Sequence, residues 1–174
     1  AFGSPRILVV GDLILDQYVY GDAERLSPEA PVPVVRERYR HTRVGGAANV
    51  AVFLAAMGAQ PVLAGVCGDD ASGGTLRELL LQAKVDAAPV ISVERRPTST
   101  KTRFIGLAQH RHQQQMLRLD HETLEPIDIA SGNRLLVAVE EEMASCHLIC
   151  IEDYNKGLLS DALCQKIISM ARAA

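Results

Sequence analysis

Two short stretches in the first third of the chain carry residue types that suit binding of a polyhydroxylated ligand. Asp12 and Asp16 follow an apolar run, and Gly45 and Gly46 stand shortly before Asn49. Carboxylates accept hydrogen bonds from hydroxyl groups, and glycines at the mouth of a helix expose backbone N–H groups to a ligand. Asn49 adds a side chain that both donates and accepts. The combination predicts a carbohydrate-binding cleft and makes a carbohydrate-binding enzyme the first hypothesis.

Each of these signals also has a purely structural interpretation. Asp12 and Asp16 fit turn and capping positions as well as ligand contacts. The pair Gly45-Gly46 fits a flexible turn before a core helix. Asp12 nevertheless lies directly beyond the first predicted strand, where ligands of open α/β sheets bind.

A second group of charged residues lies on a predicted hairpin of strands 100–107 and 115–119. Lys101 and Arg103 are two positions apart and therefore share one face of their strand, and Arg118 lies on the other strand. Cations beside the cleft suit an anionic substrate such as a sugar phosphate, which arginine binds as a fork. The alternative is an ordinary solvated hairpin face.

A third group follows the predicted strand 147–151. Asp153 and Lys156 place an acidic and a basic group at the carboxyl end of that strand, where ligands of parallel sheets collect. The alternative is a strand-to-helix turn in which Gly157 supplies the flexibility.

The elements that must position these residues alternate along the chain. Apolar runs predict strands at 6–10, 61–66, 90–93 and 147–151, and periodic stretches predict helices at 47–57, 74–84, 131–145 and from 158 or 159 onward. The alternation indicates an α/β fold with a doubly wound, mostly parallel sheet. Residues 147–151 are expected to be a buried strand. The helix 47–57 is apolar nearly all round, so we expect it to be buried on more than one side.

Two segments, about 17–38 and 99–119, depart from this pattern. Both alternate in polarity, as strands with one solvated face do. The prolines of residues 31–35 cannot donate to a central ladder, which puts that stretch on an edge. We expect the two segments to form a small β-lid outside the main sheet.

Composition excludes several classes of function. The 174 residues carry a net charge of −3 and only 4% aromatic residues, so neither a basic field nor stacking platforms favour nucleic acid. No apolar run approaches the roughly 20 residues that cross a bilayer, and no signal peptide is visible. Four cysteines without a Cys-x-x-Cys pair favour free thiols in a reducing compartment, and no metal-ligand spacing occurs. We expect a cytoplasmic protein without membrane or nucleic-acid partners.

Taken in order, the motifs resemble the ribokinase/phosphofructokinase B family of carbohydrate kinases. Residues 45–51 (GGAANVA) are similar to its N-terminal signature. Residues 11–34, with the run SPEAPVP, are similar to the heptose 7-phosphate kinase domain of ADP-heptose synthesis enzymes. The stretches TKTR, RLD and DYNKG follow in the expected order. The resemblance starts at about Arg6, continues to the end of the chain and implies a ribokinase-like fold.

This resemblance implies transfer of a phosphoryl group from ATP, with Mg²⁺, to a sugar hydroxyl. In the heptose branch the acceptor is the anomeric hydroxyl of D-glycero-β-D-manno-heptose 7-phosphate, and the 1,7-bisphosphate leads toward the lipopolysaccharide core. A homodimer through the lid is also implied. The residues implied to hold sugar hydroxyls are Asp16, Gly45, Gly46 and Asn49, with Asp12 beside them. The candidates for the phosphorylated end are Lys101, Arg103 and Arg118.

The chain departs from the family pattern in one respect. Its 174 residues contain neither the Gly-Ala-Gly-Asp motif that carries the catalytic base nor the Asn-x-x-Glu motif associated with Mg²⁺. We therefore expect residues 1–174 to be the N-terminal part of one sugar-kinase domain, with no catalytic residue, without the ATP-binding half and inactive alone. Another sugar or nucleoside kinase of the family, or a non-catalytic sugar-phosphate-binding or dimerisation module, remains an alternative.

Overall fold

A parallel four-stranded sheet, sheet A, forms the body of the molecule. The computed structural model describes residues 3–107 and 112–173. In spatial order, sheet A consists of β5 (Val90–Val93), β4 (Gln60–Gly68), β1 (Arg6–Gly11) and β8 (Leu148–Glu152). Its central strands are apolar runs buried on both sides, as parallel strands require.

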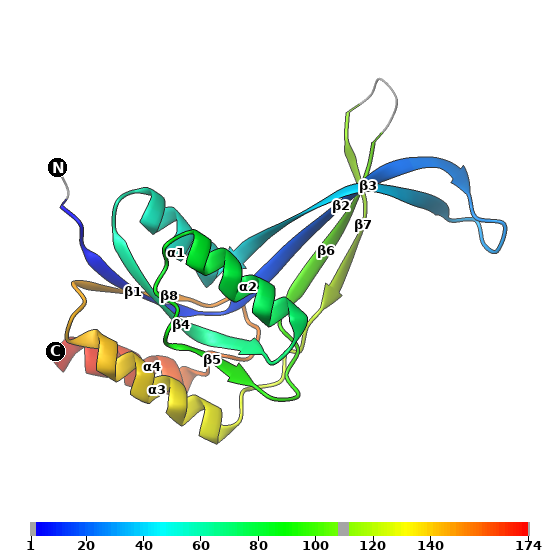
Figure 1. Ribbon diagram of the computed structural model, residues 1–174. Helices are drawn as coiled ribbons and strands as arrows, with labels where there is room; N and C mark the ends of the chain where they lie inside the picture. Colours follow the sequence, from blue (N-terminus) through cyan, green and yellow to red (C-terminus); the bar gives the residue numbers. More distant parts are fainter. Residues whose placement is uncertain (1–2, 108–111, 174) are drawn as a thin grey trace.

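A second four-stranded sheet, sheet B, projects away from this body (Figure 1). In spatial order it consists of β3 (Pro33–Gly46), β2 (Leu13–Leu26), β6 (Thr100–Gly106) and β7 (Gln114–His121). The β2–β3 and β6–β7 pairs are antiparallel, while β2 and β6 run parallel. Sheet B contains most of the two segments that the sequence separates from the main sheet, and β3 with its Pro33 lies at an edge.

In the described part of the chain, four helices cover the two faces of sheet A. The helices are α1 (Ala47–Ala56), α2 (Ala71–Gln82), α3 (Ile129–Met143) and α4 (Asp161–Ala173). One apolar core joins α1 and α2 to Val9 and Leu63, and a second joins α3 and α4 to Leu8 and Val62. Helices on both faces of a parallel sheet confirm the predicted doubly wound α/β fold.

Three local predictions are corrected by the structure. Strand β8 lies at the edge of sheet A, and Leu148 is 54% exposed, so the strand is not buried as expected. Helix α1 buries Ala47, Ala48 and Ala51, but Phe53 is 61% exposed and Met57, the residue after the helix, is 82% exposed, so the stretch is covered on one side only. Helix α2 begins at Ala71, three residues earlier than expected, and Asp70 is its N-cap, accepting a hydrogen bond from the Gly73 N–H.

The described ranges contain no helix that is both long and apolar enough to span a membrane.

Candidate functional site

The site is built where the chain leaves sheet A and where α1 begins. Asp12 alone separates β1 from β2, and Gly46 is the N-cap of α1. The Ala47 N–H donates to the Asp12 carbonyl at 2.9 Å, which fixes the two connections against each other. Gly46 has a φ of 59°, and a Cβ there would overlap the Asp12 carbonyl. A glycine is therefore required at this point of contact.

Asp16 and the first turn of α1 converge at this junction. The Asp16 carboxylate lies so close to Gly45 that a Cβ on Gly45 would overlap its Oδ2 atom. Asn49 is the third residue of α1, is half-buried and makes no side-chain hydrogen bond within the described part of the chain. Gly46 offers no side-chain cap, which leaves N–H groups of the first turn open to a ligand. The structure brings together Asp16, the two glycines and Asn49, while their contact with a sugar stays a prediction.

Asp12 is placed differently from Asp16. Its side chain is buried, with a residue exposure of 3%, and Oδ2 accepts from the N–H groups of Tyr154 at 2.8 Å and Lys156 at 3.1 Å. Burial raises the pKa of Asp12 above its ordinary value, although these two hydrogen bonds oppose the shift. The geometry favours a role in holding the loop after β8, which is the turn interpretation weighed above.

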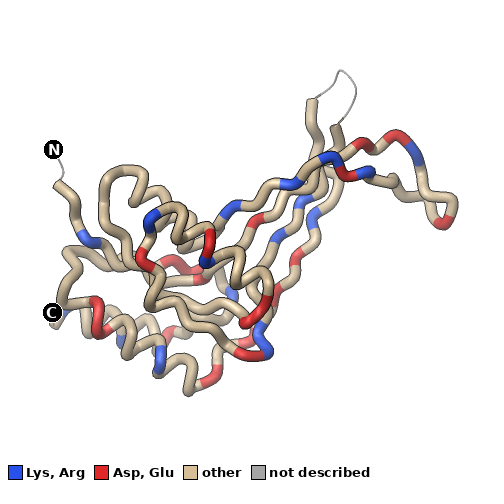
Figure 2. Tube along the Cα trace, viewed as in Figure 1, with Lys and Arg blue, Asp and Glu red and all other residues tan. Residues whose placement is uncertain are grey.

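The predicted cations share one face of sheet B with Asp16. Lys101 pairs with Asp16 across the β2–β6 ladder, and Arg103 donates to the Asp16 carboxylate at 2.5 Å. The Arg103 guanidinium also lies 5.1 Å from the centre of the Tyr18 ring, at cation–π range. Figure 2 shows the charged residues along these strands. The prediction that Lys101 and Arg103 lie on one face is confirmed.

Arg118 enters the same face from β7. It lies directly opposite Arg103 and donates to both oxygens of Asp120, at 2.9 and 3.0 Å. Lys101 also donates to Asp120, at 3.1 Å. Burial alone would raise the pKa of Asp120, but the hydrogen bonds from Lys101 and Arg118 hold it below its ordinary value. Asp120 thus keeps its negative charge and neutralises part of the cationic face.

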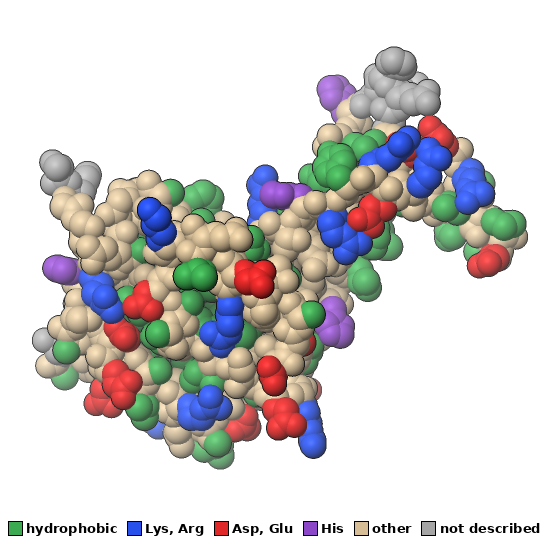
Figure 3. Space-filling view, viewed as in Figure 1, with side chains coloured by type: hydrophobic (Ala, Val, Ile, Leu, Met, Phe, Trp, Pro, Cys, Tyr) green, Lys and Arg blue, Asp and Glu red, His purple; other side chains and the backbone are tan. Residues whose placement is uncertain are grey.

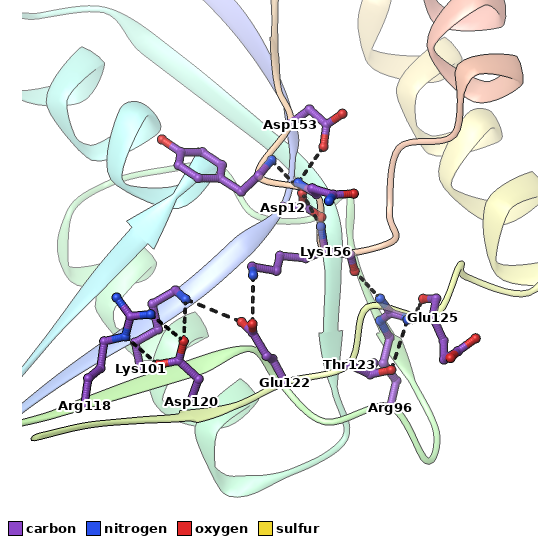
Figure 4. A network of polar contacts seen from close by, with 12 residues as sticks. Asp12, Arg96, Lys101, Arg118, Asp120, Glu122, Thr123, Glu125, Asp153 and Lys156 are labelled. Atoms are coloured by element: carbon purple, nitrogen blue, oxygen red, sulfur yellow. Dashed lines mark hydrogen bonds and ion pairs between the residues drawn. The ribbon is translucent and has the colours of Figure 1, made fainter.

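The loop after β8 brings Lys156 to this face from the other sheet. Lys156 Nζ donates to Glu122, the residue after β7, at 2.8 Å (Figure 4). Asp153 turns to its own loop, where its carboxylate accepts from the Asn155 N–H at 2.8 Å. Asn155 and Gly157 have φ values of 55° and 78°, so the loop is a tight turn. The structure places Lys156 at the site and Asp153 beside it.

Two residues of the site have no counterpart in the sequence analysis. Arg96 donates to the carbonyls of Lys156 and Glu125, and so ties the loop after β8 to the segment after β7. Glu122 links the two lysines Lys101 and Lys156. The sequence offered one hint of Glu122, its position two residues after Asp120 and therefore on the same side of an extended chain. Pairs of acidic residues with this spacing are too common to identify a site residue.

Four carboxylates of the site, those of Asp12, Asp16, Asp120 and Glu122, are already engaged by other groups of the protein. Among the described residues no group of three or more His, Cys, Asp or Glu side chains is arranged to hold one. Asp12 is occupied by backbone N–H groups, Asp16 by Arg103, and Asp120 and Glu122 by cations. These residues therefore do not fit a divalent-cation site.

Comparison with known proteins identifies the family. The model of the pfkB family carbohydrate kinases matches residues 4–172. Relatives named bifunctional protein HldE are 44% identical over 172 residues in Methylobacillus flagellatus and 38% identical over 172 residues in Rhodopseudomonas palustris. These matches cover 97% and 99% of this chain but only 34% of each relative. The chain belongs to the pfkB family of carbohydrate kinases, and it spans about a third of the length of these curated relatives.

Solved structures support the same fold. A carbohydrate kinase from Agrobacterium tumefaciens superposes with a TM-score of 0.71 at 23% identity, covering 97% of this chain and 50% of that chain. Ribokinase from Arabidopsis thaliana, solved with ribose and ATP, gives a TM-score of 0.63 at 17% identity, covering 98% of this chain and 51% of that chain. At these identities the similarity shows a ribokinase-like fold.

Proposed function

We propose that this chain supplies the sugar-binding part of an ATP-dependent kinase that phosphorylates the anomeric hydroxyl of heptose 7-phosphate. The product is the 1,7-bisphosphate, an intermediate on the route through ADP-heptose to the lipopolysaccharide core. One observation carries the proposal: Asp16, the open first turn of α1 and a row of cations meet at one place. Family membership and the HldE relatives support it.

Each end of the substrate has suitable partners in this arrangement. Asp16 accepts hydrogen bonds from sugar hydroxyls, and Asn49 with the backbone at Gly45 and Gly46 supplies further donors and an acceptor. Lys101, Arg103 and Arg118 then face the 7-phosphate, which guanidinium groups bind through two parallel hydrogen bonds. Asp153 and Lys156 lie in the loop after β8, and Lys156 reaches Glu122 beside the cationic face, so the two are the remaining candidates for substrate contact.

Phosphoryl transfer also needs groups that these 174 residues do not supply. A base must lie within hydrogen-bond reach of the attacking hydroxyl, and the transferred group needs electrostatic stabilisation. No Gly-Ala-Gly-Asp or Asn-x-x-Glu motif occurs in the sequence. In this proposal ATP and Mg²⁺ are bound mainly by the rest of a longer, cytoplasmic protein, and the 174 residues alone are inactive.

The outer part of sheet B fits a homodimer contact. Val32, Phe104 and Leu117 line a common pocket there, and Leu117 is 60% exposed. Figure 3 shows hydrophobic side chains on the projecting part of the molecule. Because the side chains of a strand alternate between the two faces of the sheet, Leu117 points to the other face from Arg118. In this proposal the cationic face is left to the substrate. We propose that sheet B is both the lid of the site and the contact with a second copy.

A coupled assay of ADP release tests the proposed function. The full-length protein that contains this chain is expected to turn over heptose 7-phosphate with ATP and Mg²⁺, and to leave ribose and adenosine unphosphorylated. Turnover of ribose or adenosine instead would support another kinase of the family. Sugar-phosphate binding in a thermal-shift measurement without any ADP release would support a non-catalytic module. The 174 residues alone are expected to bind substrate weakly and to release no ADP.

A further inference from the structure

The Glu122 carboxylate lies between two lysines that reach it from different sheets. Lys101 comes from β6 of sheet B, and Lys156 comes from the loop after β8 of sheet A. Oε1 of Glu122 accepts from Lys156 Nζ at 2.8 Å, and Oε2 lies 3.5 Å from Lys101 Nζ. Figure 4 shows both lysine side chains directed at this carboxylate. Glu122 is thus a link between sheet B and the loop after β8.

The surroundings strengthen the interaction of these three charges. The side chains of Lys101, Glu122 and Lys156 are 15%, 17% and 16% exposed. Water screens charges poorly at such positions, so ion pairs there are stronger than at an open surface. Oε2 of Glu122 is shielded from solvent and has no hydrogen-bond partner in the described part of the chain. Its stabilisation there comes from the nearby Lys101 ammonium.

The two lysines depend on Glu122 to different degrees. Lys101 keeps a second partner in Asp120, at 3.1 Å. Lys156 has its backbone fixed, because its N–H donates to Asp12 and its carbonyl accepts from Arg96. Its ammonium group is directed by Glu122 alone among the described residues. Loss of the Glu122 charge therefore releases the Lys156 side chain while its backbone stays in place.

We propose that Glu122 is a positioning residue that holds the Lys156 ammonium beside Lys101, so that both ammonium groups face one anionic group of the substrate. This role rests on the proposed function and adds Lys156 to the cations at the phosphorylated end. Ordering a lysine side chain costs conformational entropy, and a lysine already held in place avoids part of that cost on binding. Because Glu122 and a phosphate are both anionic, Glu122 does not contact the phosphate itself and acts through the lysines.

The first test compares Glu122→Gln with Glu125→Gln in the full-length protein. Glu125 lies on the same segment and carries the same charge, but its side chain is exposed and makes no hydrogen bond or ion pair within the described ranges, which makes it the matched control. Glu122→Gln is expected to raise KM for heptose 7-phosphate about tenfold, with kcat and KM for ATP nearly unchanged. Glu125→Gln is expected to match the wild type. Thermal unfolding of each variant checks that it is folded.

A double-mutant cycle separates positioning from general stabilisation. If Glu122 acts through Lys156, then Lys156→Gln raises KM on its own, and adding Glu122→Gln changes it little further. Amine-labelling mass spectrometry gives a readout without substrate: Lys156 is expected to react several-fold faster in Glu122→Gln than in Glu125→Gln, because its ammonium is no longer held.

The outcomes distinguish this inference from the proposed function. An active wild type whose Glu122→Gln variant matches Glu125→Gln in KM and in Lys156 labelling overturns the positioning role alone. Fully additive effects of Glu122→Gln and Lys156→Gln also overturn it, because the two residues would then act independently. A wild type that is inert toward every sugar phosphate overturns the proposed function and this role with it.

Discussion

At the scale of single residues, the site depends on two glycines that let a carboxylate and a backbone carbonyl approach the chain closely. The Asp16 carboxylate occupies space that a Cβ on Gly45 would fill, and the Asp12 carbonyl does the same at Gly46. The two glycines therefore have separate roles. Gly46 allows the sharp entry into α1, and Gly45 lets the Asp16 carboxylate approach the helix. Arg103 then holds that carboxylate from the other side.

Gly45→Ala tests this arrangement. The added methyl group overlaps the Asp16 carboxylate and turns it away from the mouth of α1, so KM for the sugar is expected to rise about tenfold or more. The matched control is Gly74→Ala in α2, where a Cβ meets nothing within 4 Å. Gly74→Ala is expected to keep the wild-type KM and to stabilise the helix by about 0.5–1 kcal/mol in urea unfolding. A wild-type KM for Gly45→Ala would show that Asp16 does not need this position.

At the scale of elements, Asp70 joins helix α2 to the segment that leads into β6. Its carboxylate accepts from the Gly73 N–H at 2.8 Å, and from the Thr98 N–H and hydroxyl at 2.9 and 2.7 Å. Thr98 is buried and accepts in turn from the Gly68 N–H. One side chain thus caps a helix and anchors the strand that carries Lys101 and Arg103.

Asp70→Asn is expected to destabilise the protein by about 1–2 kcal/mol at about pH 7. Burial alone would raise the pKa of Asp70, but hydrogen bonds from Thr98 and Gly73 hold it below its ordinary value. A lowered carboxyl pKa contributes stability above the pKa of the unfolded chain, and that stability is lost as the pH falls through the folded pKa. The difference between wild type and variant should therefore shrink toward about pH 3 in urea unfolding.

Asp69→Asn is the matched control for this prediction. Asp69 is the exposed neighbour of Asp70, and it makes no hydrogen bond or ion pair within the described ranges. The substitution removes the same charge and is expected to leave the free energy of unfolding almost unchanged. Equal losses in the two variants would attribute the effect to net charge rather than to the cap.

The order of elements could be predicted from the sequence because each type has its own periodicity. The apolar runs of β1 and β4 locate two of the parallel strands, and the apolar stretch 47–57 locates α1. Burial could not be predicted for β8 and α1, since an apolar element looks the same at a sheet edge as in its centre. The Glu122–Lys156 contact joins the segment after β7 to the loop after β8, 34 positions apart in the chain, which no local pattern reveals.

At the scale of the whole molecule, the two faces of sheet B are chemically distinct. Asp16, Lys101, Arg103 and Arg118 share one face, while Phe104 and Leu117 pair across the other. Because β2 continues β1 after a single residue, sheet B is attached directly to the centre of sheet A. One thin layer can therefore contact a polar substrate on one side and an apolar partner on the other.

Leu117→Lys tests the proposed contact between copies. A charge in the apolar pocket with Phe104 is expected to convert a dimer to a monomer, measured as molar mass by light scattering. Leu124→Lys is the matched control, because Leu124 is equally exposed, at 60%, but lies outside sheet B. It is expected to stay dimeric. A dimeric Leu117→Lys variant would show that the contact lies elsewhere. A monomeric wild type would show that the proposed contact does not form.

The direct opposition of Arg103 and Arg118 has a thermodynamic consequence. Like charges facing each other across a strand pair repel, and here Asp16 and Asp120 offset that repulsion. A sugar hydroxyl that competes for Asp16 weakens its hold on Arg103 and leaves the two guanidinium groups less compensated. On the proposed function, a phosphate dianion bound between the two guanidinium groups would take over the charge compensation that Asp16 gives up. Binding of the sugar end would then favour binding of the phosphate end. A ligand with both groups should bind more tightly than the separate affinities of its parts predict.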